Sequence, residues 1–133
     1  MLKTQQEYEL IAKQILNSCF EVHKELGAGL LESVYEHCLF EELSLHGLNV
    51  KSQIKLPVIY KSKVLEKDFI IDLLVEDSII IELKSVESLM PVHEVQLVTY
   101  MKLADKRLGF LVNFNVSQMK EGIRRKVNNY YFS

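Results

Sequence analysis

The chain has 133 residues, of which 48% are apolar and 26% charged, and its formal net charge at pH 7 is −2. This composition predicts one globular domain, residues 1–133, with a real hydrophobic core. It excludes a transmembrane span and any overall electrostatic attraction to nucleic acid. The first ten residues, MLKTQQEYEL, lack the apolar core expected of a signal peptide. We therefore expect a cytoplasmic protein with no membrane contact, whose two cysteines, Cys19 and Cys38, are buried free thiols.

The first third of the chain predicts two helices. Thr4 and Glu7 have the spacing of a capping box, and apolar residues then recur at helical spacing from Ile11 to Leu26. A second helix is expected from Leu30 to His46. Because only a short glycine-containing loop joins them, we expect the two helices to form an antiparallel hairpin.

The periodicity then changes to that of strands, with one later helix. Two long β-branched runs are apolar on both faces, which predicts a central place in a sheet covered on each side. The helix that follows them makes the flanking strands parallel. The result is a three-layer α/β/α sandwich with a mixed central sheet and α-α-β-β-β-α-β order. Its strands are predicted at Ile54–Tyr60, Leu65–Val75, Ile79–Val86, Arg107–Asn115 and, at an edge, Ile123–Val127, and its later helix at Pro91–Ala104.

Three charged residues interrupt the two most apolar strands. Glu82 and Lys84 share one face of their strand because side chains alternate. If a three-residue loop, residues 76–78, joins the strands, Asp72 lies directly opposite Glu82. A two-residue loop would turn Asp72 away from Glu82, and we predict the three-residue loop.

Two opposed buried carboxylates repel each other, so a positive charge must lie between them. Lys84 supplies one charge, and a hard divalent cation such as Mg²⁺ or Mn²⁺ would supply more. The alternative is a buried Glu82–Lys84 ion pair with Asp72 at a frayed strand end. The later helix directs Gln96 and Tyr100, which are one turn apart, toward the same region, whereas His93 fits an exposed helix start.

These residues resemble a known pattern. Asp72 followed by Glu82-Leu83-Lys84 resembles the D…(D/E)xK signature of the PD-(D/E)XK nuclease superfamily, and Gln96…Tyr100 resembles the QxxxY motif of its exonuclease-like branch. Residues 27–36, 53–60 and 109–115 resemble the GxxExxR family assigned to that superfamily. Ile71 stands in place of the signature's proline, and Tyr35 stands in place of the arginine of GxxExxR.

The resemblance implies a restriction-endonuclease-like fold that hydrolyses DNA phosphodiester bonds with Mg²⁺ or Mn²⁺. It implies that Asp72, Glu82 and the Leu83 carbonyl bind the metal and that Lys84 orients or deprotonates the attacking water. An acid of the second helix, Glu32 or Glu36, would complete the site. Gln96 and Tyr100 would brace Lys84 or contact the substrate backbone.

Two alternatives stay open. The same fold could be a catalytically inactive module that binds nucleic acid or a protein partner, as a homodimer in one version. A more remote alternative is an unrelated enzyme with Lys84 as a nucleophile. Two basic groups are either phosphate-binding patches or solvated surface: Lys51, Lys55, Lys61, Lys63 and Lys67 in the middle of the chain, and Lys120, Arg124, Arg125 and Lys126 near its end.

Overall fold

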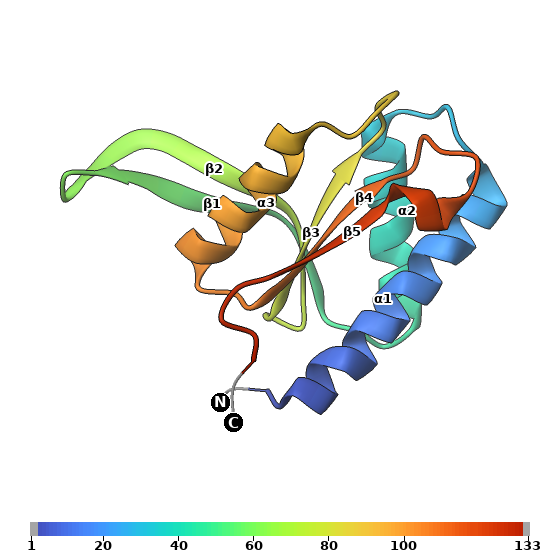
Figure 1. Ribbon diagram of the computed structural model, residues 1–133, viewed down its shortest axis with the longest axis horizontal. Coiled ribbons are helices and arrows are strands. Elements are labelled where there is room, and N and C mark those ends of the chain that lie inside the picture. Colours follow the sequence, from blue (N-terminus) through green and yellow to red (C-terminus); the bar gives the residue numbers. More distant parts are fainter. Residues whose placement is uncertain (1–2, 132–133) are drawn as a thin grey trace.

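A computed structural model describes residues 3–131 as a five-stranded mixed sheet between two helical layers. The strands lie in the order β1-β2-β3-β4-β5, with α1 and α2 over one face and α3 over the other (Figure 1). The predicted fold class is confirmed. The elements are α1 (Gln5–Leu26), α2 (Glu32–Leu45), β1 (Val50–Tyr60), β2 (Lys63–Val75), β3 (Ile79–Lys84), α3 (Pro91–Ala104), β4 (Leu108–Asn113), a 3-10 helix η1 (Met119–Gly122) and β5 (Ile123–Val127).

The helical hairpin forms as its sequence signals predict. The Thr4 hydroxyl accepts a hydrogen bond from the Glu7 N–H at 3.1 Å, and the Glu7 carboxylate accepts one from the Thr4 N–H at 2.9 Å. Helix α2 begins at Glu32, two residues later than predicted. Both cysteines are free, but only Cys19 is fully buried, whereas Cys38 is partly exposed. Among the described helices, none has the length and apolar character needed to cross a membrane.

Tyr35 fixes the loop between α1 and α2. Its side chain is fully buried, and its ring stacks on Phe114 with ring centroids 4.6 Å apart. The phenol donates a hydrogen bond to the Gly27 carbonyl at 2.6 Å and accepts one from the Leu30 N–H at 3.2 Å. The residue thus ties both ends of the loop to the core.

The strand register matches the expected three-residue loop. Val75 pairs with Ile79 and Leu73 with Ile81, and residues 76–78 form the turn. Glu76 and Asp77 adopt left-handed backbone conformations with φ of 51° and 53°. Strands β3 and β4 are parallel neighbours joined through α3, and β5 closes the sheet as an edge strand.

One prediction about β2 is wrong over part of its length. The strand is covered on both faces only near its end, because its pairing with β3 stops at Leu73. Residues 63–70 pair only with β1, and together with residues 54–60 they form a two-stranded ribbon that extends beyond the body of the sheet (Figure 1). At its base Phe69 packs against Tyr100 of α3. We call residues 54–70 the arm. Lys61 and Ser62, with φ of 50° and 66°, make its tight turn.

Replacing Tyr35 with phenylalanine should lower the free energy of unfolding by about 1–2 kcal/mol. The ring stack survives, but the partly buried Gly27 carbonyl and Leu30 N–H lose their partner. Urea denaturation followed by circular dichroism measures the change. Tyr60→Phe is the control, since Tyr60 is exposed at the arm's turn, and an equal loss in both variants would contradict the role given to the Tyr35 hydroxyl.

Candidate functional site

The site forms where β2 and β3 separate. Beyond the Leu73–Ile81 pair, side chains replace the backbone ladder. The Glu82 carboxylate accepts a hydrogen bond from the Asp72 N–H at 3.1 Å, and the Asp72 carboxylate accepts one from the Leu83 N–H at 2.8 Å. Each carboxylate therefore binds the backbone of the opposite strand, which holds Asp72 and Glu82 face to face.

Burial and a neighbouring acid both act on the pKa of Glu82. Glu82 is 5% exposed, and burial, followed by the charge of Asp72, raises its pKa to about 9. The hydrogen bond from the Asp72 N–H and the nearby Lys84 oppose this rise without reversing it. The raised pKa favours the protonated form of Glu82 at pH 7, so a cation that entered would compete with that proton.

Lys84 lies beside the acids without pairing with them. The described residues form no ion pair within 4.0 Å that includes Lys84, so they contain no Glu82–Lys84 bridge. Its positive charge nevertheless opposes the rise that burial causes in the pKa of both Glu82 and Glu32. The ammonium therefore lies within electrostatic reach of both helix α2 and strand β3, and it has free donors for a ligand.

Helix α3 brings its two predicted residues to the site. Gln96 donates a hydrogen bond from its amide to the Tyr100 hydroxyl at 3.1 Å. Tyr100 is mostly buried, and burial followed by the negative charge of Glu82 raises its pKa. His93 instead accepts a hydrogen bond from the Met90 N–H at 2.9 Å and so caps the start of α3, as the sequence indicates.

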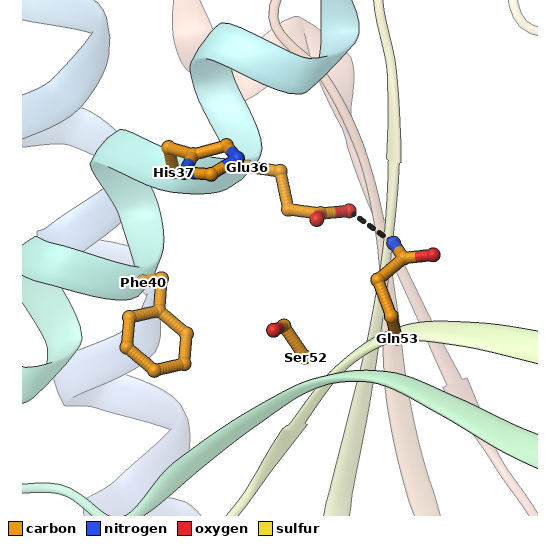
Figure 2. A pocket seen from close by; sticks show the side chains of 5 residues that line it. All are labelled: Glu36, His37, Phe40, Ser52 and Gln53. Carbon is orange, nitrogen blue, oxygen red and sulfur yellow. Dashed lines mark hydrogen bonds between the residues drawn. The ribbon is translucent and has the colours of Figure 1, made fainter.

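The acids of α2 border the site on its other side. Burial is the main cause that raises the pKa of Glu32 and of Glu36, and the charge of Asp72 adds to both. Glu36 accepts a hydrogen bond from the Gln53 amide at 2.9 Å, and both residues line one side of a pocket of about 360 Å³ (Figure 2). His37, Phe40 and Ser52 complete the lining of this pocket.

Sequence reasoning missed the role of Gln53. The β1–β2 register places it opposite Asp72, between the pairs formed by Ser52 with Leu73 and Ile54 with Ile71. Its φ of 53° lies in the left-handed region, which disfavours a side chain and here interrupts the ladder beside the carboxylates. A glutamine within a strand carries no sequence signal for this conformation.

Asn113 was also missed, although its position offered a signal. It is a buried amide at the end of the otherwise apolar strand β4, and it pairs with Lys84. Its side chain accepts a hydrogen bond from the Val86 N–H at 3.0 Å and donates one to the Val86 carbonyl at 2.9 Å. Ser85 donates to the Leu30 carbonyl at 2.6 Å. These bonds fix the chain that leaves Lys84.

The donor set fits a hard divalent cation. Two carboxylates face each other, and each has only one oxygen held by a backbone N–H, which leaves the second oxygen of each for a ligand. Among residues 3–131 there is no cluster of three or more His, Cys, Asp or Glu side chains placed to hold a metal. The protein would thus supply few ligands and leave the rest to water, which is the arrangement that Mg²⁺ prefers.

Comparison with known protein families matches residues 9–126 to a family described as the PD-(D/E)XK nuclease superfamily. No curated protein and no solved structure matches the chain. The matched residues include all the acidic, basic and amide side chains assembled at the site.

Stability should depend on pH through Glu82. The folded state raises the pKa of Glu82 from 4.5 to about 9, so it binds a proton that the unfolded chain releases. The resulting stabilisation is complete below pH 4.5, declines as the pH rises and is lost above about 9. Without metal, the free energy of unfolding should therefore fall by on the order of a few kcal/mol between pH 5 and pH 9.

The variant Glu82→Gln isolates this effect. A neutral amide can still accept the Asp72 N–H and donate to the Asp72 carboxylate, so the variant should match wild type at pH 5 and exceed its stability at pH 9. Denaturation at both pH values in a chelator measures the difference. Parallel pH profiles for the two proteins would show that Glu82 does not titrate in this range.

Proposed function

The chain belongs to the PD-(D/E)XK nuclease superfamily, and from this premise we propose that it hydrolyses DNA phosphodiester bonds with a divalent metal ion. The observation that carries the proposal is the pairing of Asp72 with Glu82 at the strand fork, with Lys84 beside them. Nucleases of this superfamily typically use divalent metal ions. The three residues occur in the order of the superfamily's signature.

We propose that Asp72, Glu82 and the Leu83 carbonyl hold Mg²⁺ or Mn²⁺, with Glu32 or Glu36 as a further acid. When bound, such an ion supplies Lewis-acid stabilisation of the phosphate charge and lowers the pKa of a water ligand. The chain contributes the fixed geometry. The two backbone-bonded carboxylates are positioned before any ligand arrives, so little reorganisation is needed.

Lys84 acts on the substrate side of the site. Its free ammonium donors orient the water that attacks phosphorus and stabilise the negative charge that develops on the phosphate oxygens. The leaving group is the sugar oxygen on the opposite side of the phosphorus. Gln96 and Tyr100 form a hydrogen-bonded pair, in which the buried Tyr100 positions the exposed Gln96 amide to contact the substrate backbone next to Lys84.

The finer relationship to the GxxExxR family is also a proposal. Glu32 occupies the acidic position of that motif and begins α2, where Lys84 and Asp72 influence its pKa. Tyr35 occupies the arginine position, and its hydroxyl is used entirely in holding the α1–α2 loop. In this chain the position serves the fold, and phosphate contact must come from other residues.

The second candidate function is a catalytically inactive module that binds nucleic acid or a protein partner. Two observations favour it: Tyr35 replaces the motif arginine, and no third acid of the described chain joins Asp72 and Glu82 in a metal-binding cluster. Metal binding separates the two functions, since the inactive module needs none. A cytoplasmic location and a homodimer remain predictions from the sequence.

The test of the proposal is cleavage of supercoiled plasmid DNA with Mg²⁺ or Mn²⁺. Wild type should nick the DNA, and Glu82→Gln and Lys84→Ala should each lower the rate by at least about 100-fold, since each removes charge that acts in the transition state. Lys13→Ala, on the exposed surface of α1, is the matched control and should cleave normally.

Metal binding is measured separately by thermal unfolding. Near 100-fold excess over its dissociation constant, Mg²⁺ should stabilise wild type by about 2.7 kcal/mol and Asp72→Asn by almost nothing. Stabilisation without cleavage would favour an inactive metal-binding protein. Neither stabilisation nor cleavage would leave the inactive module as the better description.

A further inference from the structure

We propose that the arm, residues 54–70, is a DNA-binding ribbon that lies in a groove of duplex DNA whose backbone reaches the Asp72–Glu82 site. The inference rests on the proposed nuclease function and adds to it the substrate class and the element that holds it. Three features of the arm support it: its positive net charge, the lack of ion pairs at its lysines, and its continuity with the strand that carries Asp72.

The arm has the opposite charge to the rest of the molecule. It contains Lys55, Lys61, Lys63 and Lys67 against only Glu66 and Asp68, whereas the whole chain has a net charge of −2. All six side chains are exposed. A local basic surface on an acidic protein concentrates its attraction for phosphate at one place.

The arm lysines are free to bind, unlike the other basic run. Arg125 forms an ion pair with Glu9 at 2.5 Å, Lys126 forms one with Glu94 at 2.6 Å, and Arg124 donates to backbone carbonyls. None of the ion pairs among the described residues uses an arm lysine. Arg124, Arg125 and Lys126 are therefore engaged within the fold, and the arm lysines are the larger basic group open to a ligand.

The arm continues from the site along strand β2 and carries lysines on both faces of the ribbon. Lys63 and Lys67 lie an odd number of residues from Asp72 and therefore on the opposite face of β2 from it, whereas Lys55 lies on the Asp72 side. Lys55 pairs with Ile70, which lies two residues before Asp72 on the same side of strand β2. The spacing between Asp72 and Lys63, nine residues along β2, corresponds to roughly 30 Å in an extended strand. This length is close to the rise of one turn of duplex DNA, about 34 Å.

The shape of the arm fits a groove. A two-stranded β-ribbon enters the major groove of B-DNA, where its edges face the two phosphate backbones. Lysines lie on both strands of the arm and at its turn. Ile59 and Val64 form a cross-strand pair near the tip and are 62% and 64% exposed, so they offer apolar contact to base edges such as the thymine methyl group.

The test compares two triple variants. Lys61, Lys63 and Lys67 are changed to alanine in one, and the exposed Lys13, Lys24 and Lys120 in the other, so that both lose three positive charges. Binding to a 20-base-pair duplex is measured by fluorescence anisotropy in a chelator at 50–200 mM salt. The arm variant should lose roughly tenfold or more in affinity and about two to three units of salt slope, whereas the control should stay near wild type.

A second readout separates this inference from the nuclease proposal. Hydrolysis of bis(4-nitrophenyl) phosphate with Mn²⁺ needs the site but cannot reach the arm, so the arm variant should keep that activity while losing duplex cleavage. If neither wild type nor the variants hydrolyse either substrate, the nuclease proposal fails. The duplex-binding measurement still tests whether the arm binds DNA. Equal duplex affinity and salt slope in the two variants would overturn the inference. So would an equal loss on single-stranded DNA, or a wild-type dimer in sedimentation that the arm variant does not form.

Discussion

The structure depends on one exchange of hydrogen bonds at the fork between β2 and β3. A continuing ladder would have paired the backbone of Asp72 with that of Glu82, but their carboxylates accept the opposing N–H groups instead. This substitution satisfies donors that would otherwise be lost where the strands part. It also places two acids together in a buried location, at an electrostatic cost that the high pKa of Glu82 records. The replacement of the backbone pair by these two hydrogen bonds thus accompanies three features: the end of the β2–β3 ladder, the start of the arm and the pairing of the acids in the site.

The central part of the fold was predictable from the sequence because local rules agree there. β-Branched runs, a three-residue turn and a proline at a helix start fixed the register, the parallel crossover and the bounds of α3. The register alone set Asp72 opposite Glu82, and the QxxxY spacing brought Tyr100 near them. Their assembly at one place needed only alternation along strands and one turn of helix.

The remaining features depend on long-range contacts that no local pattern encodes. The left-handed backbone of Gln53 and its bond to Glu36 join strand β1 to helix α2. The extent of the arm was missed for a related reason. Apolar residues such as Val64 and Ile70 look like core residues in sequence, yet they are exposed because β3 stops pairing before it reaches them. Burial is decided by which strand lies alongside, and that information lies elsewhere in the chain.

The separation of β2 from β3 also puts the two acids on strands that go different ways. Asp72 belongs to the strand that continues into the arm, whereas Glu82 belongs to the strand that stays in the body of the sheet. Leu73 with Ile81 is the last backbone pair that joins the two strands. The separation of the two carboxylates is therefore not fixed within a single strand. It depends on the two hydrogen bonds between the strands and on how the base of the arm, where Phe69 contacts Tyr100, is held against α3.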